Sequence, residues 1–163
     1  MKGFTLIENL VAMALLMIAL GGGLVAVGQF NKGKAVFYEA IRVKSGLNEQ
    51  YVKAIEGTAF GEDTPLKFGV CFESDRYYLF ATTSVWSERN NTYTQMITLP
   101  ENMEFSDFNF LNDCEGQSNS CAIFFPITGA LEQAGSVVLK DNKTSQEYII
   151  SVSKGGLVEL TTL

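Results

Sequence analysis

The sequence predicts an α+β fold in which one long N-terminal helix packs on an antiparallel β-sheet head. Two observations lead to this prediction. Apolar residues recur at helical spacing as far as Glu56, whereas after Leu66 they alternate with a period of two. We therefore expect a helix over residues 4–56 and a β-rich globular head over residues 57–163.

The N-terminal part of the predicted helix is strongly apolar. No charged residue lies between Asn9 and Asn31, and as a helix Leu10–Gly28 would be about 28 Å long, enough to cross a bilayer core. No small-x-small cleavage site closes the run, as one would close a secretory signal. The sequence predicts a retained, single-pass membrane helix over residues 4–30.

Glu8 is the exception at the start of this apolar segment. A charged side chain near hydrocarbon costs about 2.5 to 3.5 kcal/mol, so such a residue is expected to have a function and a partner. No residue of this chain is an obvious partner. The alternative is an ordinary signal anchor that contains an accidental polar residue.

The residues around Glu8 form a known pattern. Gly3-Phe4-Thr5-Leu6-Ile7-Glu8, preceded by Met1-Lys2, resembles the cleavage and methylation motif of type IV pilins and pseudopilins. The resemblance implies that residues 1–3 are a leader cut off after Gly3, that Phe4 is N-methylated, and that Glu8 meets the N-terminal amine of a neighbouring subunit. It also implies the partners: other pilins or pseudopilins, the prepilin peptidase/methyltransferase, an inner-membrane assembly platform and, before assembly, membrane lipid.

Three consecutive glycines, Gly21-Gly22-Gly23, interrupt the apolar helix, and each costs about 1 kcal/mol relative to Ala in a helix interior. One interpretation is a small-residue surface for helix contacts in lipid. The other, by resemblance to several pilins, is a segment that melts when the subunit packs into a filament. The sequence leaves both interpretations open.

Residues 31–56 have the pattern of an amphipathic helix that continues the membrane helix. Their apolar residues recur at three- and four-residue steps, so they form one face that we expect to pack under the head. Gly57 is expected to cap this helix at its C-terminus. The face consists of Val36, Ala40, Val43, Leu47, Tyr51 and Ala54.

The head has the pattern of an antiparallel sheet made of short strands. The segments are rich in β-branched and aromatic residues and are separated by turn signals, of which Asp141-Asn142-Lys143 and Lys154-Gly155-Gly156 are the clearest. The expected strands lie in "LKFGVCFE", "RYYLFATTSVW", "YTQMITLP", "MEFSDFNF", "CAIFFPI", "SVVLKD", "QEYIISVS" and "LVELTT".

The last part of the head also resembles a known family. The order "AIFFPITGALEQAGSVVLKD", then "EYIISVSKGGLVEL", is similar to the C-terminal half of the H-type minor pseudopilins and their minor-pilin relatives, which implies a pilin fold. Some of these relatives bind DNA through basic residues after the final glycine. The segment Gly155–Glu159 contains none, which argues against that activity here.

Composition excludes several classes of function. The head, counted from Gly57, has six basic and 14 acidic residues and a net charge of −8, so it offers no basic surplus for a nucleic acid. The chain has no His, which removes histidine bases, histidine-dependent triads and most zinc sites. We expect neither an enzyme nor a cofactor.

Two cysteines predict an exported head. Cys114 and Cys121 bracket the polar loop "DCEGQSNSC", whose Gly, Ser and Asn residues allow a short ring to close. We expect a disulfide between them, with a pair of reduced thiols as the alternative. Cys71 lies in an apolar strand pattern and is expected to be a buried, free thiol.

Oxygen ligands between Asp107 and Glu115 raise the question of a Ca²⁺ loop. The spacing of Asp107, Asn109, Asn112, Asp113 and Glu115 is not that of an EF-hand, and alternation with Phe108 and Phe110 suits the exposed face of a strand instead. We expect no metal.

These observations together predict a structural minor pilin or pseudopilin of a type IV pilus, competence or type II secretion filament. It would be held in the cytoplasmic membrane with its head outside the cytoplasm. The alternative is a membrane-anchored adhesin or DNA-uptake receptor that uses the β head. A tethered hydrolase ranks last because only carboxylate or Lys chemistry remains to it.

Overall fold

The structure is a computed structural model that describes residues 6–57, 67–82, 91–110, 112–113, 120–124, 129–131 and 134–163. Side chains are described at these positions except 19, 21–33, 91–93, 112–113 and 120. The chain divides into two compact units, one that ends at Ala35 and one that spans Val36–Leu163. Each unit is considered by itself.

Helix α1 (Leu6–Glu56) is 51 residues long and runs through Gly21–Gly23 without a break in its assignment. It ends where the sequence predicts, because Gly57 takes a left-handed φ of 60° and its N–H donates to the carbonyl of Ala54 at 3.4 Å. The prediction of one helix capped by glycine is confirmed. Both interpretations of Gly21–Gly23 stay predictions.

The part of α1 in the first unit has an apolar surface. Every side chain from Leu6 to Ile18, and that of Leu20, is exposed, with Leu6 80% and Ile18 73% exposed. No helix among the described residues is long and apolar enough to cross a membrane. The membrane span over residues 4–30 therefore stays a prediction.

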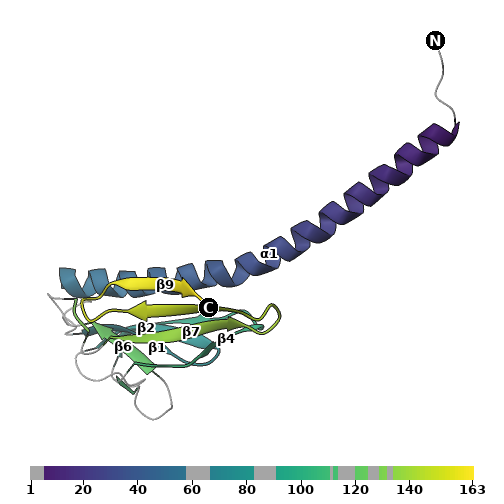
Figure 1. Ribbon diagram of the computed structural model, residues 1–163. Coiled ribbons are helices and arrows are strands. Elements are labelled where there is room, and N and C mark those ends of the chain that lie inside the picture. Colours follow the sequence, from purple (N-terminus) through teal and green to yellow (C-terminus); the bar gives the residue numbers. More distant parts are fainter. Residues whose placement is uncertain are drawn as a thin grey trace. The chain divides into compact units, whose positions relative to one another are not determined.

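The second unit contains two antiparallel sheets (Figure 1). The first has the strand order β3-β2-β1-β6-β5 and the second the order β4-β7-β8-β9. The strands of the first are β1 (Lys67–Phe72), β2 (Arg76–Thr82), β3 (Asn91–Thr98), β5 (Asn112–Asp113) and β6 (Ser120–Phe124). Those of the second are β4 (Met103–Ser106), β7 (Gly135–Asp141), β8 (Gln146–Val152) and β9 (Val158–Thr162).

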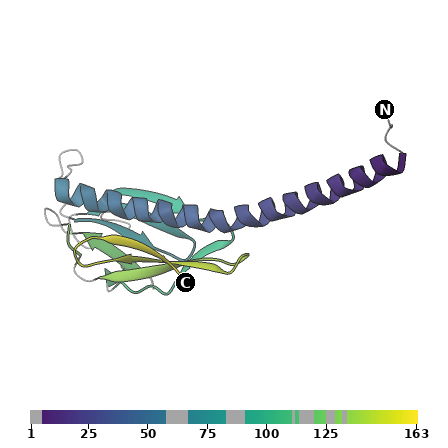
Figure 2. The ribbon, with the colours of Figure 1, turned by 45° about the horizontal axis from the view of Figure 1, so that its top comes forward.

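The C-terminal half of α1 covers one face of these sheets (Figure 2). The main core is formed by residues of the helix and of both sheets. All the predicted face residues of the helix are buried except Tyr51, which is half-buried. The two sheets meet through aromatic rings: Phe72 of β1 lies 5.2 Å from Phe105 of β4 and stacks on Phe110 at 5.8 Å between ring centroids. The predicted packing of the helix under an antiparallel head is confirmed.

Strand β4 is shorter than the sequence predicts. It ends at Ser106 because Asp107 takes a left-handed φ of 49°, which takes the chain out of the extended conformation. The segment does not leave the sheet completely, since the N–H of Asn109 donates to the carbonyl of Ser136 on β7 at 2.9 Å. The bend therefore places Asn109 beside the beginning of β7.

Tyr51 fixes the last turns of α1 to the loops of the head. Its ring contacts Phe124 edge-on, with ring centroids 6.0 Å apart. Gly129 and Gly156 lie against the same ring, and a Cβ atom at either position would collide with it. Both glycines also have left-handed φ values, 61° and 85°. The ring can pack here only because both loop residues that contact it are glycines, which have no Cβ atom.

Asp141 joins two turns of the second sheet. Its carboxylate, in a side chain that is 2% exposed, accepts hydrogen bonds of 2.8 Å from Asn102 Nδ2, from the N–H of Lys143 and from Thr144 Oγ1. Burial alone would raise the pKa of Asp141, but these hydrogen bonds favour the charged form and hold that pKa below its ordinary value. The carboxylate thus connects the turn before β4 to the turn between β7 and β8.

We expect Asp141→Ala to lower the free energy of unfolding at pH 7 by about 2 to 3 kcal/mol, because buried donors lose their acceptor. A lowered pKa in the folded state means that this stabilisation is complete above the unfolded pKa of about 3.9 and is lost as pH falls further. Urea unfolding at a series of pH values measures it. The difference in the free energy of unfolding between the variant and wild type should shrink below pH about 4. A difference that does not change with pH would contradict the lowered pKa of Asp141. Glu101→Ala, an exposed change in the neighbouring turn, is the control.

Candidate functional site: the assembly segment and the surface of the head

The N-terminal segment, which contains the expected processing and assembly residues, is described only in part. Gly3 and Phe4, the expected processing and methylation residues, lie outside the described residues. Glu8 lies in the first turn of α1 and is exposed. A carboxylate is favoured at this end of a helix because the unpaired N–H groups there carry partial positive charge. Its predicted pairing with the amine of a neighbouring subunit stays a prediction.

The structure corrects the disulfide prediction. Cys71 and Cys121 are both disulfide-bonded, and they are directly opposite each other in the pairing of β1 with β6. With three cysteines in the chain, these two can only be joined to each other. The predicted bond between Cys114 and Cys121 is therefore wrong, and so is the prediction that Cys71 is a free thiol. Cys114 itself lies outside the described residues.

The disulfide belongs to a second apolar cluster on the face of the five-stranded sheet that points away from α1. Cys71 and Phe80 are fully buried there, and Cys121 is 2% exposed. The remaining members are Tyr78 and Ile123. Because this cluster lacks contact with the main core, the bond between β1 and β6 supports a part of the sheet that the helix does not cover.

A group of charged residues lies at the turn between β1 and β2. Arg76 contacts Asp75 at 2.8 Å and Glu73 at 3.3 Å. The hydrogen bond from Arg76 holds the pKa of Asp75 below its ordinary value. One guanidinium thus binds two carboxylates, which leaves the group with a net negative charge and its one cation paired.

No three His, Cys, Asp or Glu side chains come together as a metal site within the described part of the chain. Of the residues considered for a Ca²⁺ loop, Asp107 and Asn109 follow β4, and Asn112 and Asp113 form β5. Glu115 lies outside the described residues.

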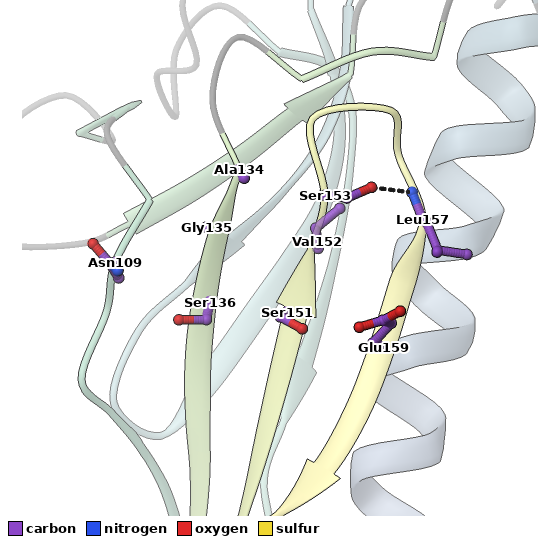
Figure 3. Close-up of a pocket in the computed structure, with 9 residues that line it drawn as sticks. All are labelled: Asn109, Ala134, Gly135, Ser136, Ser151, Val152, Ser153, Leu157 and Glu159. Atoms are coloured by element: carbon purple, nitrogen blue, oxygen red, sulfur yellow. Dashed lines mark hydrogen bonds between the residues drawn. The ribbon is translucent and has the colours of Figure 1, made fainter.

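A hollow of about 350 Å³ opens on the four-stranded sheet, on the face opposite the core (Figure 3). Ser136, Ser151 and Glu159 lie in one row across β7, β8 and β9, because Ser136 pairs with Ser151 and Ser151 with Glu159. Asn109 lies beside the row. The remaining lining residues are Ala134, Gly135, Val152, Ser153 and Leu157, and none of the nine is basic.

Sequence reasoning missed this hollow. Ser136, Ser151 and Glu159 each have the polar, outward position that alternation along a strand predicts. The sequence does not reveal the register that aligns the three strands. Nor does it reveal that Asp107 takes a left-handed conformation, which brings Asn109 alongside. The one signal in the sequence that could have indicated the hollow is that each of the three strands has a polar residue at an outward position.

Comparison with known proteins adds a motif and a fold. Residues 1–24 match the family model for the prokaryotic N-terminal methylation motif. The structure is similar to that of the minor pseudopilin EpsH from the type 2 secretion system of Vibrio cholerae, with a TM-score of 0.53 and 14% sequence identity, over 78% of this chain and 97% of that one. The chain thus combines the N-terminal methylation motif with a fold similar to that of a minor pseudopilin. No curated protein matches it.

Proposed function

We propose that this pilin-like chain is a structural, minor-pseudopilin-type subunit of a type II secretion filament or of a related pilus. It is made as a precursor, cut after Gly3, N-methylated at Phe4 and held in the cytoplasmic membrane with its head outside. The assembly machinery then extracts it into the filament. Its function is mechanical and requires no catalytic residue.

The single observation that carries this proposal is the combination of motif and fold in one chain. The methylation motif of residues 1–24 overlaps the start of α1, and the same helix continues to Glu56, where it forms part of the core of a head with the minor-pseudopilin fold. A secretory signal or an ordinary membrane anchor does not require this continuity. A filament subunit does, because its helix must both pack with neighbours and carry the head.

The surface of α1 up to Leu20 supports the same function. A helix that is apolar on all sides must be covered, either by lipid or by other helices. The apolar side chains from Leu6 to Ile18 are exposed within the described part of the chain. Lipid before assembly and neighbouring subunits afterwards would supply that cover. Glu8, in the first turn, would then set the register against a neighbour's N-terminal amine, because an ion pair is strong where water is excluded.

The experiment that tests the proposal is N-terminal mass analysis of the chain from a host with an active prepilin peptidase. We expect the mature chain to begin at N-methylated Phe4. The same chain from a host without the peptidase should retain Met1, which provides the control. A chain that begins at Met1 in the host with the peptidase would contradict the proposal.

A further inference from the structure

We propose that the hollow over β7, β8 and β9 receives a lysine side chain of a neighbouring subunit, with Glu159 as the acceptor of its charge. The inference rests on the proposed function, since it requires another subunit beside the head. It goes beyond that function because it assigns a contact to named residues of the head and a chemistry to the partner.

The polar side chains of the hollow are aligned by the sheet itself. Residues directly opposite each other on neighbouring strands have Cβ atoms about 5 Å apart. The hydroxyls of Ser136 and Ser151 and the carboxylate of Glu159 therefore form a short row on one face (Figure 3). Ser136 and Ser151 are half-buried and Glu159 is exposed, so the row leads from the floor of the hollow to solvent.

The wall of the hollow beside β7 is held rigidly. The N–H of Asn109 donates to the carbonyl of Ser136 at 2.9 Å, and the ring of Phe110 lies directly on Gly135. A Cβ atom at Gly135 would collide with that ring. The backbone of Asn109 is therefore held next to the row of hydroxyls.

Charge is balanced elsewhere on this sheet face but not in the hollow. Lys140 of β7 and Glu147 of β8 lie on the same face and pair at 3.5 Å. Within the described part of the chain, the side chains of Asn109, Ser136, Ser151 and Glu159 make no hydrogen bond or ion pair with another residue. The only hydrogen bond drawn among the lining residues runs from the N–H of Leu157 to Ser153 Oγ (Figure 3).

The hydrogen-bond acceptors that line the hollow favour a cation with several donors. Hydroxyl, amide and carboxylate oxygens all accept hydrogen bonds, whereas an ammonium group has three donors and no acceptor. A compact ammonium on a flexible stem can approach the carboxylate of Glu159 and the hydroxyls in the same row. The guanidinium of arginine has five donors fixed in a planar fork that suits a carboxylate, whereas the three donors of an ammonium rotate and adapt to hydroxyl acceptors. The net charge of −8 on the head also favours a basic partner surface.

Carbodiimide crosslinking of sheared filaments tests this inference. The reagent activates a carboxylate, a nearby amine displaces the activating group as a urea, and an amide bond forms between the two side chains. Mass spectrometry should find Glu159 joined to a lysine of another subunit. Ser136→Ala/Ser151→Ala should lower the yield of that crosslink about five- to tenfold, because two hydrogen bonds to the ammonium are lost. Glu147→Gln, on the same sheet face but outside the hollow, should leave the yield unchanged.

The fraction of the chain recovered in filaments is measured in the same samples. If the chain is in the filaments but Glu159 forms no crosslink, or only one to Lys154 of its own chain, the lysine contact is wrong and the proposed function stands. If the crosslink forms but Ser136→Ala/Ser151→Ala does not lower its yield, the hollow is not the binding site. If the chain is absent from filaments, both proposals fail.

Discussion

Removing the Cys71–Cys121 disulfide should lower the free energy of unfolding of the head by about 4 kcal/mol. The bond closes a loop of roughly fifty residues, and the chain-entropy model assigns about this value to a loop of that length. The local structure makes the effect severe, because the bond lies in an apolar cluster separate from the main core. Without the bond, β1 and β6 would be joined only by their backbone pairing and by packing in this cluster.

The measurement is urea unfolding of the detergent-solubilised chain for Cys71→Ala/Cys121→Ala against wild type. Both cysteines are changed together because a single change would leave a thiol that could pair with Cys114. Cys114→Ala is the matched control and should unfold at nearly the wild-type urea concentration. Peptide mapping without reduction should link the peptides of Cys71 and Cys121. A link between Cys114 and Cys121, or a large loss of stability in Cys114→Ala alone, would contradict the structure.

Gly156→Ala should be nearly as destabilising, by about 3 kcal/mol. An L-residue in the left-handed conformation costs roughly 1 to 2 kcal/mol, and Gly156 has φ of 85°. The added methyl group would also overlap the ring of Tyr51 and lie 2.9 Å from the carbonyl oxygen of Gly129. Overpacking of this kind typically costs a further 1 to 3 kcal/mol. The last turns of α1 would lose their fixed contact with the head.

Gly155 is a matched control for this change, because it is the preceding residue of the same turn. The nearest atom to a Cβ atom there is Ser153 Oγ at 4.0 Å, and Gly155 has no left-handed φ. Gly155→Ala should change the free energy of unfolding by less than about 0.5 kcal/mol. Equal losses for the two alanine variants in urea unfolding would show that Tyr51 is not held in the way that the structure indicates.

The fold was predictable because its determinants are local. The face of α1 from Val36 to Ala54 follows from helical spacing, and most of the expected strands appear where period-two patterns predict them. The capping role of Gly57 was also predictable, because it follows from the position of this glycine at the end of the helical pattern. The motif at Gly3–Glu8 was recognised from residue order alone.

The remaining features depend on contacts between distant residues. Cys114 is close to Cys121 in sequence, but the partner of Cys121 is set by the pairing of β6 with β1, some fifty positions away. The row of Ser136, Ser151 and Glu159 likewise depends on the register of three strands. Spacing along the chain carries no information about which strands become neighbours, so neither feature could be derived from it.

Glu8 separates a filament subunit from a protein that is merely anchored in a membrane. Glu8→Gln removes a charge, so membrane insertion should become no harder, and cleavage after Gly3 should proceed. Assembly should suffer, because a buried ammonium that loses its carboxylate typically costs about 3 to 5 kcal/mol. Asn9→Gln, a polar change at the next position, should leave assembly unaffected.

The most direct test is the fraction of processed chain recovered in sheared filaments for Glu8→Gln, Asn9→Gln and wild type. The ion-pair account predicts a strongly reduced fraction for Glu8→Gln alone, with normal processing in all three. Recovery of Glu8→Gln in filaments at the wild-type level would contradict it.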